Sequence, residues 1–318
     1  METVTYSVVI PVYRNAESLG ELLRALADLD ARLGHALEAV FVVDASPDDS
    51  HAILRDLLPQ AGFNSQLLLL SRNFGSFAAI RCGLGAARGR YLAVLAADLQ
   101  EPPQLLARFF EVLSQDDIDV VVGTRISRND PWFTRTAAAL FWRLYRRLIN
   151  PAIPQGGVDL FACNTTFRDQ LLALEEHHSS LIGLIFWLGF RRAEVPYERL
   201  ARRHGRSAWT LQRKITYMLD SVFSFSDLPV RLLLLTGIVG ITVAIALGLT
   251  VLAMRLAGGI GAPGYTATMI TILFFGGLNA LGLGIIGAYV WRAFANTQRR
   301  PLAILMHSES FSRTAPEP

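Results

Sequence analysis

Residues 232–254 read LLLLTGIVGITVAIALGLTVLAM, and residues 265–291 read YTATMITILFFGGLNALGLGIIGAYVW. Neither stretch contains a charged residue, and an arginine stands at each end of the first and directly after the second. As a helix rising about 1.5 Å per residue, each stretch is long enough to cross a hydrocarbon core of roughly 30 Å. The sequence therefore predicts a transmembrane hairpin with spans at 231–255 and 265–292.

The charges around this hairpin predict its orientation. Basic residues lie before the first span and after the second, whereas the loop 256–264 has no charge. The flanking basic residues are Arg199, Arg202, Arg203, Arg206, Arg213, Lys214, Arg292, Arg299 and Arg300. The positive-inside rule puts both flanks in the cytoplasm, so we expect an inner (plasma) membrane protein with both termini cytoplasmic. Because these residues lie where anionic headgroups are found, we expect a membrane partner and no nucleic acid.

The residues before the hairpin have the pattern of a soluble α/β domain. Apolar strands are predicted at 7–12, 39–43, 66–70, 91–95 and 119–122, and helices at 16–33, 77–87 and 105–114. Strands alternating with helices favour a largely parallel sheet, in which ligands bind beyond the carboxyl ends of the strands. No signal peptide is predicted, because the apolar run at 8–12 is short and lacks a basic segment before it. Cys82 and Cys163 are expected to be buried, reduced thiols without a disulfide or zinc site.

Two further segments favour helices near the membrane. Residues 132–149 combine basic and aromatic side chains, which is typical either of an interfacial helix or of an ordinary packing helix. Residues 209–225 carry an apolar stripe with a basic opposite side, which favours an amphipathic helix lying in the membrane interface. A soluble packing helix is the alternative for this segment.

Small residues recur every fourth position in both spans. The first set is Thr236, Gly240, Ala244 and Gly248, and the second is Gly276, Ala280, Gly284 and Ala288. Each set forms a flat ridge that allows close helix–helix approach in lipid. We expect the ridges to pack within the hairpin or between subunits, and we expect a homo-oligomer, for example a tetramer.

Three carboxylates fall at predicted strand ends: Asp44, Asp98 and Asp159. Asp98 is followed two residues later by Gln100, and such a pair of oxygen ligands suits a hard cation such as Mg²⁺ or Mn²⁺. The alternative for each isolated acid is a helix cap or a turn. Ser46, after Asp44, is also expected to cap the following helix.

Several motifs together resemble family 2 glycosyltransferases. They are SVVIPVY at 7–13, SRNFG at 71–75, ADLQEPP at 97–103, VGTR at 122–125 and RRHGRS at 202–207. With the double span, they look more narrowly like polyisoprenyl-phosphate glycosyltransferases, the group of dolichyl-phosphate mannose synthases and bacterial undecaprenyl-phosphate glucosyl and aminoarabinosyl transferases. The resemblance implies a GT-A fold and an inverting, metal-dependent transfer from a nucleotide sugar to a polyprenyl phosphate. The expected role is cell-envelope glycan or lipopolysaccharide modification.

The resemblance also implies roles for individual residues. Those expected to bind the donor are Pro11, Tyr13, Asp44, Arg72, Asp98, Arg125, Arg202 and Ser207. Asp98 and Gln100 are expected to hold the metal, and Asp98, Asp159 and Arg125 are the catalytic candidates. Arg135 and Arg202 are expected at the acceptor phosphate. The implied domains are a cytoplasmic GT-A domain at 1–207, a juxtamembrane amphipathic helix at 208–230, the two spans, and a cytoplasmic tail at 293–318.

The sequence departs from the family pattern at two acids. Val43 and Ala96 stand where the family usually has aspartates, and Ala45 stands where it usually has glycine. These losses weaken the predicted metal site and leave open a catalytically impaired homologue that acts as a membrane scaffold or binding protein. A processive polysaccharide synthase is disfavoured because no Gln-x-x-Arg-Trp motif is found. A transporter is disfavoured because the spans contain almost no polar residues.

Overall fold

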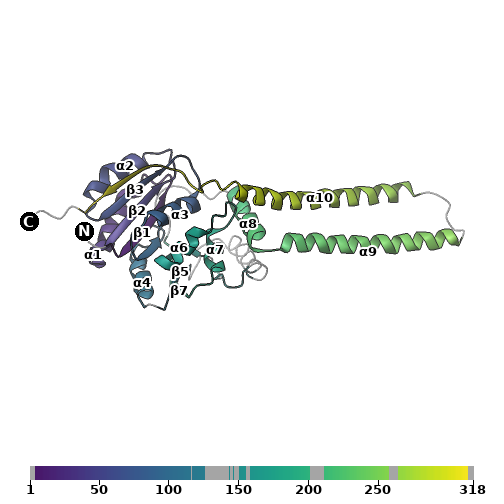
Figure 1. The fold of residues 1–318 in the computed structure, drawn as a ribbon, viewed down its shortest axis with the longest axis horizontal. Helices are drawn as coiled ribbons and strands as arrows, with labels where there is room; N and C mark the ends of the chain where they lie inside the picture. Colours follow the sequence, from purple (N-terminus) through teal and green to yellow (C-terminus); the bar gives the residue numbers. More distant parts are fainter. Residues whose placement is uncertain are drawn as a thin grey trace, which may run out of the picture. The chain divides into compact units, whose positions relative to one another are not determined.

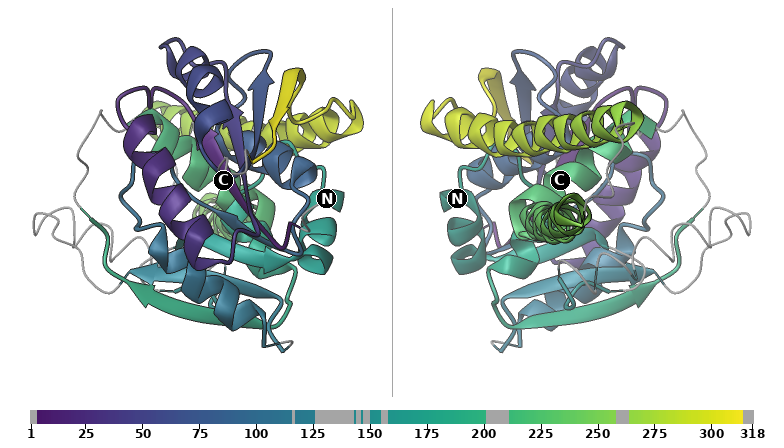
Figure 2. Two further views of the ribbon diagram at one scale, coloured as in Figure 1. Left: turned by 90° about the vertical axis from the view of Figure 1, so that its left-hand side faces the viewer. Right: turned by 90° about the vertical axis from the view of Figure 1, so that its right-hand side faces the viewer.

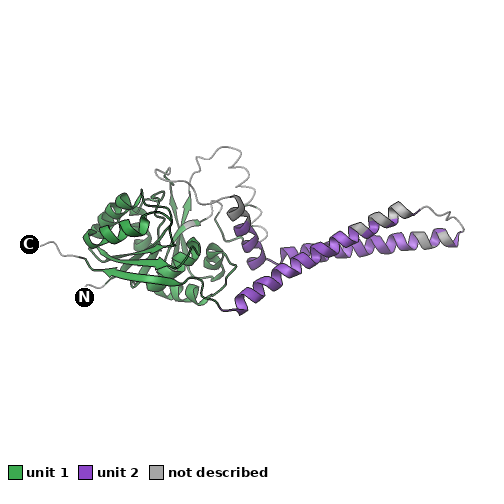
Figure 3. Cartoon of the chain, turned by 90° about the horizontal axis from the view of Figure 1, so that it is seen from above, with its two compact units in different colours: residues 1–214, 300–318 green, residues 215–299 purple. Residues whose placement is uncertain are grey.

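The computed structural model describes residues 4–115, 117–125, 143, 146, 150–154, 158–200, 211–257 and 264–313. The chain divides into two compact units, coloured separately in Figure 3. The first combines Met1–Lys214 with the C-terminal Arg300–Pro318, and the second is Ile215–Arg299. The first unit contains the sheet, and the second contains the apolar helices.

Among the described residues of the first unit, eight strands form one mixed sheet in the order β7-β5-β6-β4-β1-β2-β3-β8. Their bounds are β1 Tyr6–Val12, β2 Leu37–Val43, β3 Asn64–Leu70, β4 Tyr91–Val94, β5 Val120–Arg125, β6 Val158–Asn164, β7 Arg192–Tyr197 and β8 Leu305–Phe311. The central strands β4, β1, β2 and β3 are mutually parallel, and β7 is parallel to β5. Strands β6 and β8 run antiparallel to their neighbours.

Helices pack on both faces of this sheet (Figures 1 and 2). The helices are α1 Leu19–Arg32, α2 Ser50–Leu57, α3 Ser76–Ala86, α4 Gln104–Leu113, α6 Thr165–Ala173 and α7 Leu181–Trp187, with a short 3₁₀ turn η1 Leu58–Gln60. Alternate residues of a strand point to opposite faces, so Val8 and Ile10 of β1 join the core with α1 and α4. Val9 points the other way, toward α3, where a Cβ on Gly83 would clash with the Val9 side chain. A larger residue at Gly83 would therefore force α3 off the sheet.

The five predicted strands are confirmed to within a few residues as β1 to β5, and the three predicted helices as α1, α3 and α4. The sequence analysis missed β6, α6, α7 and β7, and of these β6 and β7 join β5 in the half of the sheet beyond β4. These elements are short, and β7 has a mixed apolar and charged sequence (RAEVPY) that gives no clear period. Of the two cysteines, both free, Cys163 is buried as predicted, and burial raises the pKa of its thiol to about 12. Cys82 is only partly buried.

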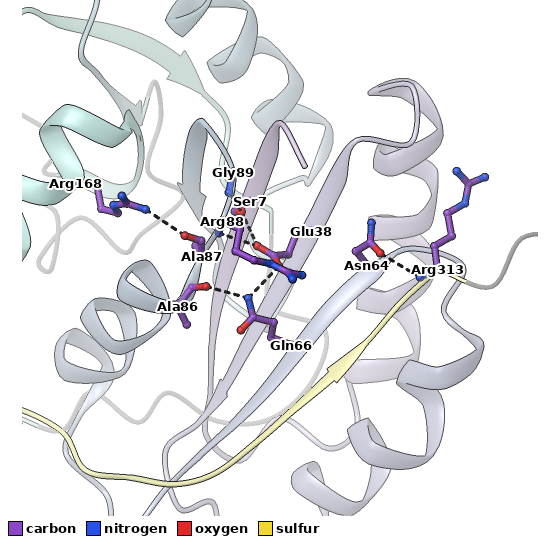
Figure 4. Close-up of polar contacts among 10 residues, drawn as sticks. All are labelled: Ser7, Glu38, Asn64, Gln66, Ala86, Ala87, Arg88, Gly89, Arg168 and Arg313. Carbon is purple, nitrogen blue, oxygen red and sulfur yellow. Dashed lines mark hydrogen bonds and ion pairs between the residues drawn. The ribbon is translucent and has the colours of Figure 1, made fainter. Parts of the chain in front are cut away.

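The largest departure from expectation is the C-terminal strand β8. The sequence analysis treats residues 293–318 as a tail, yet α10 continues through Thr297 and β8 then pairs antiparallel with β3. The strand lies at the edge of the sheet (yellow in Figures 1 and 2), and just after it the backbone N–H of Arg313 donates to Asn64 Oδ1 at 3.1 Å (Figure 4). The last part of the chain therefore belongs to the same unit as its beginning.

A buried polar network occupies the edge of the sheet where the parallel strands begin (Figure 4). Glu38, the second residue of β2, is fully buried and accepts hydrogen bonds from Ser7 Oγ at 2.9 Å, Gln66 Nε2 at 2.9 Å and Arg88 Nε at 2.7 Å. Ser7 Oγ in turn accepts from the backbone N–H of Gly89 at 2.9 Å. These contacts satisfy the buried Glu38 charge and fix the amino-terminal ends of the parallel strands. The chemistry is therefore expected at the opposite, carboxyl ends of these strands.

The second unit contains most of helix α8 (Leu211–Phe225) and the whole of α9 (Leu228–Leu256) and α10 (Tyr265–Thr297). Helices α9 and α10 are each long and apolar enough to cross a membrane, at positions close to those predicted. Within this unit Arg292 of α10 makes an ion pair with Asp220 of α8, with Nη2 2.8 Å from Oδ1. The Phe223 and Tyr289 rings meet edge to face at 5.1 Å. Polar and aromatic contacts therefore hold α8 against the C-terminal end of α10.

The predicted small-residue ridges are only partly engaged inside the hairpin. A Cβ on Gly240 of α9 would lie 3.2 Å from the Phe275 ring, so this position faces α10. On α10 it is Gly282, which lies off the predicted ridge, whose Cβ would approach Leu233 at 3.3 Å. Gly276 and Gly284 have no such neighbour within 4 Å. Gly276 and Gly284 of the second ridge therefore make no close contact within the described part of the hairpin, and packing of the ridges within the hairpin or between subunits stays a prediction.

Candidate active site

The sheet topology brings most of the predicted site residues to the side of the sheet where the parallel strands end, which we call the carboxyl edge. The parallel strands β1, β2 and β4 end there, before Tyr13, Asp44 and Asp98 respectively. Strand β5 runs in the same direction and ends at Arg125. Because β6 is antiparallel, with Val158 opposite Thr124, its second residue, Asp159, is at this same edge rather than after a strand end. Residues far apart in sequence therefore converge at the carboxyl edge, where α/β sheets bind ligands.

Hydrogen bonds join the loops after β1 and β2. The backbone N–H of Arg14 donates to Ser46 Oγ at 2.7 Å, and that of Ala16 donates to Asp48 Oδ2 at 3.1 Å. Ser46 also donates to Asp48 Oδ1 at 2.6 Å. Burial alone would raise the pKa of Asp48, but these hydrogen bonds and those from Ser50 outweigh it and lower the pKa. Ser46 thus fixes two loops, and its predicted role as a helix cap is wrong because Asp49 is the N-cap residue of α2.

The Asp44 carboxylate positions the segment that leads into α3. Its two oxygens accept hydrogen bonds from the backbone N–H groups of Phe74 at 2.7 Å and Gly75 at 2.8 Å. Gly75 is the N-cap residue of α3 and has φ 94°, a backbone conformation that is unfavourable for residues other than glycine. Arg72 stacks its guanidinium over the Phe74 ring at 4.0 Å. The loop after β2, with Asp44, and the loop after β3, with Arg72, are thus joined, and each carries a predicted donor ligand.

Asp98 begins a tight turn four residues beyond β4. The backbone N–H of Gln100 donates to Asp98 Oδ1 at 3.3 Å, and the intervening Leu99 has φ 55°. Before the turn, the buried Ser18 hydroxyl donates to the carbonyl of Ala97 at 2.8 Å. The half-buried Asp98 carboxylate is therefore held at the site edge by contacts on both sides.

Arg199 ties this turn to the segment that follows β7. Its Nη2 donates to Gln100 Oε1 at 2.7 Å, and its Nε lies 3.2 Å from Oε1 of the buried Glu101. The backbone N–H of Leu200 donates to the Gln100 carbonyl at 2.9 Å. The amide oxygen of Gln100, the atom that a metal would need, thus already accepts a charged hydrogen bond. The metal role of Gln100 stays a prediction.

Sequence reasoning missed Arg199 as a site residue. It assigned this arginine to the basic membrane flank, but the side chain is only 29% exposed and contacts the turn at Gln100 and Glu101. A charge count along the chain does not reveal such a contact, because its partners lie about 100 residues earlier. The signal in the sequence was Glu101, the acid that follows Gln100 in the motif DLQE, because a buried acid needs a basic partner.

Other predicted residues are placed less completely. Pro11 lies in β1 and Tyr13 directly follows it, with the Arg14 guanidinium 5.5 Å from the Tyr13 ring centre. Asp159 is placed by its strand position alone. Three further predicted site residues lie outside the described part of the chain: Arg135, Arg202 and Ser207.

The described residues offer few ligands for a cation. They contain no group of three or more His, Cys, Asp or Glu side chains that could enclose a metal ion. Asp98 supplies one carboxylate at the correct edge of the sheet. A single carboxylate fits a site of the Mg²⁺ type, in which the ion is held mainly by the phosphates of the substrate. It does not fit a closed site whose ligands all come from the protein.

A mixed α/β sheet with carboxylates and arginine residues at its carboxyl edge, followed by two apolar helices, defines the class: a GT-A glycosyltransferase domain with a two-helix C-terminal region. The chain belongs to glycosyl transferase family 2, whose sequence profile matches residues 7–174. The family resemblance predicted from the motifs is therefore confirmed.

Relatives match the chain over nearly its whole length. Undecaprenyl-phosphate 4-deoxy-4-formamido-L-arabinose transferase of Edwardsiella ictaluri (strain 93-146) is 34% identical over 93% of this chain and 91% of its own. The protein of the same name from Klebsiella pneumoniae (strain 342) is 33% identical over 93% of this chain and 90% of its own. An uncharacterized glycosyltransferase of Synechocystis, sll0501, is 29% identical over 95% of both chains.

Among solved structures, glucosyl-3-phosphoglycerate synthase of Mycobacterium tuberculosis is similar at a TM-score of 0.47 and 17% identity. That likeness covers 68% of this chain and 80% of the synthase chain. The synthase has also been crystallised with Mn²⁺ and UDP.

Proposed function

We propose that the protein transfers a sugar from a nucleotide-sugar donor to a polyprenyl phosphate such as undecaprenyl phosphate, with inversion, in the service of cell-envelope glycan or lipopolysaccharide modification. The observation that carries this proposal is the match to undecaprenyl-phosphate sugar transferases over 93% of the chain. That match includes both the catalytic domain and the two apolar helices. Such a combination suits a reaction between a water-soluble donor and a lipid acceptor.

In the proposed reaction a phosphate oxygen of the lipid attacks the sugar C1 atom. A new C1–O bond forms as the bond to the nucleoside diphosphate breaks, and inversion follows from this single displacement. A phosphate monoester has a second pKa of about 6, so the acceptor is mostly a dianion at pH 7 and needs no strong general base. Asp159 would orient the acceptor, and Arg125 would stabilise negative charge on the departing diphosphate.

A divalent cation, Mg²⁺ or Mn²⁺, fits this proposal as an ion brought in with the diphosphate. Asp98 would be its carboxylate ligand, with Gln100 available only if its amide oxygen leaves Arg199. When bound, such an ion would neutralise charge that develops on the leaving diphosphate. Tyr13, Asp44 and Arg72 would form the nucleotide side of the site.

The pairing of β8 with β3 supports the proposed membrane topology. Strand β3 precedes the two apolar helices in the chain, and β8 follows them, yet both belong to one sheet. If α9 and α10 each cross the bilayer, the segments before and after them must end on the same side. The charge pattern around the helices favours the cytoplasmic side for both.

The proposal is tested by incubating the purified protein with undecaprenyl phosphate and a panel of labelled nucleotide sugars, with and without EDTA. We expect one donor to yield a labelled lipid product, and EDTA to suppress it. A protein that labels no lipid with any donor, in the presence of Mg²⁺ and Mn²⁺, would contradict the proposal.

A second candidate function is a membrane scaffold or binding protein without transfer activity. It is favoured by Ala96 in place of an acid and by the contact between Arg199 and Gln100. Calorimetry with UDP and GDP in the presence of Mn²⁺ separates the two functions. Binding of UDP or GDP supports the transferase, whereas a scaffold should bind neither nucleotide.

A further inference from the structure

Side-chain oxygens accept hydrogen bonds from four successive backbone N–H groups in the loop after β1. The N–H groups of Tyr13, Arg14, Asn15 and Ala16 donate, in that order, to Asn15 Oδ1 at 3.0 Å, Ser46 Oγ at 2.7 Å, Ser50 Oγ at 3.3 Å and Asp48 Oδ2 at 3.1 Å. These contacts order the loop before any ligand binds. They also occupy the amides that a phosphate could otherwise use, so the loop offers a ligand its side chains.

Among residues 13–16, Arg14 is the one that is exposed. Neighbouring side chains of an extended strand point to opposite faces, but Arg14 has φ 57°, and its guanidinium lies over the Tyr13 ring with Cζ 5.5 Å from the ring centre. Within the described part of the chain, this guanidinium makes no ion pair and donates no hydrogen bond. The left-handed backbone is unfavourable for an arginine, and the contact with Ser46 maintains it. The loop therefore presents a planar cation and an aromatic ring together.

The order of the strands distinguishes the two ends of a nucleotide donor. Strand β1 lies between β4 and β2. In the proposed function Asp98, after β4, binds the cation and the diphosphate, whereas Tyr13 belongs to the nucleotide side. The backbone of Arg14 is bound to Ser46 in the loop after β2, on the side away from β4. Arg14 therefore belongs to the nucleoside end of the proposed site.

We propose that Arg14 is a further donor-binding residue, and that the nucleobase of the donor stacks between the Tyr13 ring and the Arg14 guanidinium. Aromatic rings and guanidinium planes both stack on nucleobases. A base in contact with both groups needs about 3.5 Å on each face, so they must lie roughly 7 Å apart. A small outward rotation of the exposed Arg14 side chain opens this space. The inference rests on the proposed function, because it assigns the nucleotide of that donor to this loop.

Calorimetry with the full-length protein and Mn²⁺ tests the stacking. The ligands are UDP, GDP and pyrophosphate, which lacks the nucleoside. Arg14→Asn removes the guanidinium, and asparagine tolerates the left-handed backbone, so the loop should keep its conformation. We expect the affinity for the nucleotide that binds the wild type to fall about tenfold, and the affinity for pyrophosphate to stay unchanged.

Two further variants separate stacking from charge. Arg14→Lys keeps the positive charge but lacks the planar guanidinium, so it should lose nearly as much nucleotide affinity as Arg14→Asn. The matched control is Arg24→Ala, which removes the same charge from the exposed face of α1 and should bind like the wild type.

Three results would overturn the assignment of Arg14 alone, in a wild-type protein that binds a nucleotide. They are unchanged nucleotide affinity in Arg14→Asn, an equal loss of nucleotide and pyrophosphate affinity, and full recovery of nucleotide affinity in Arg14→Lys. The second result would show that Arg14 acts on the phosphates, and the third that its charge suffices. A wild-type protein that binds neither nucleotide would overturn the proposed function together with this inference.

Discussion

At the scale of single residues, backbone strain gathers at the candidate site. Arg14, Ala45 and Leu99 are non-glycine residues with φ of 57°, 45° and 55°, and all three lie in the loops at the carboxyl edge. The left-handed region costs an L-residue about 1–2 kcal/mol, so the surrounding contacts must hold these loops in place. Such strain is commonly found where a loop must present backbone or side chains to a ligand.

The strain at Ala45 gives a stability prediction. Ala45→Gly removes the steric conflict of a Cβ at φ 45°, although glycine also increases the entropy of the unfolded chain. We expect a net gain of up to about 1 kcal/mol in the free energy of unfolding, seen as a higher melting temperature. The matched control is Ala31→Gly in the exposed part of α1, which should lower stability. A loss of stability in both variants would show that the loop is not strained.

Asp98 gives the activity prediction. Asp98→Ala removes the carboxylate proposed to hold the cation and diphosphate, and we expect transfer to fall by at least about 100-fold. The protein should remain folded, because the turn also depends on Ser18 and on the backbone around Gln100. Turnover with labelled donor is the measurement, and Asp28→Ala in the exposed part of α1 is the control. Near-normal turnover of the Asp98 variant would remove its proposed role.

The residues of the site were only partly predictable. The acids were found because strand-end carboxylates can be read from the local sequence and its motifs. The contacts of these residues were not predicted, because they join residues that lie far apart in the sequence. Asp44 binds Phe74 and Gly75, and Gln100 binds Arg199. These contacts depend on which strand ends meet, and that is a property of the sheet order.

At the scale of elements, Asp119 joins strands β5, β6 and β7. Its carboxylate accepts from Arg191 Nε at 2.9 Å and from Asn164 Nδ2 at 3.0 Å. The hydrogen bond from Arg191 is the main cause that lowers the pKa of Asp119, and it outweighs the effect of burial. These contacts therefore tie the two strands that the sequence analysis missed, β6 and β7, to β5.

This lowered pKa predicts an acid dependence of stability. The folded state binds the proton of Asp119 less readily than the unfolded state, so the stabilisation is present above the ordinary aspartate pKa of about 3.9 and is lost as the pH falls through the folded value. We expect Asp119→Asn to lower the melting temperature at pH 7 and to show a smaller further decrease between pH 5 and pH 3 than the wild type. Parallel curves for the two proteins would contradict this account.

Strand β8 yields a prediction about the apolar edge of β3. Deleting residues 300–318 would expose β3, whose sequence NSQLLLL includes the buried Leu67, Leu68 and Leu70. We expect a lower melting temperature and stronger aggregation, because an uncovered apolar edge invites pairing with other chains. Deleting only residues 314–318, beyond the strand, is the control. Equal melting temperatures for the two deletions would mean that β8 does not protect this edge.

The elements near the N-terminus could be predicted because their strands are apolar and separated by helices of clear period. Strand β8 could not, because its residues alternate weakly and it pairs with a strand more than 200 residues earlier. A local pattern also identified the apolar helices, but the choice of Gly282 rather than Gly284 as a close contact depends on how α10 is rotated against α9.

At the scale of the whole molecule, the order of the chain differs from the order of its sheet. The domain begins at the N-terminus, is interrupted by α9 and α10, and is completed only by the last strand. A soluble fragment that ends before α9 is therefore an incomplete domain, although it contains every predicted site residue. Assays of activity require the whole chain.

The position of β8 also has a consequence for biosynthesis. A ribosome adds about 5–20 residues per second, so the first 214 residues emerge many seconds before the closing strand. Throughout that interval the β3 edge of the nascent sheet stays uncovered, because the strand that pairs with it has not yet been made. A chaperone that binds uncovered strand edges would therefore protect the nascent chain from aggregation until β8 has been synthesised.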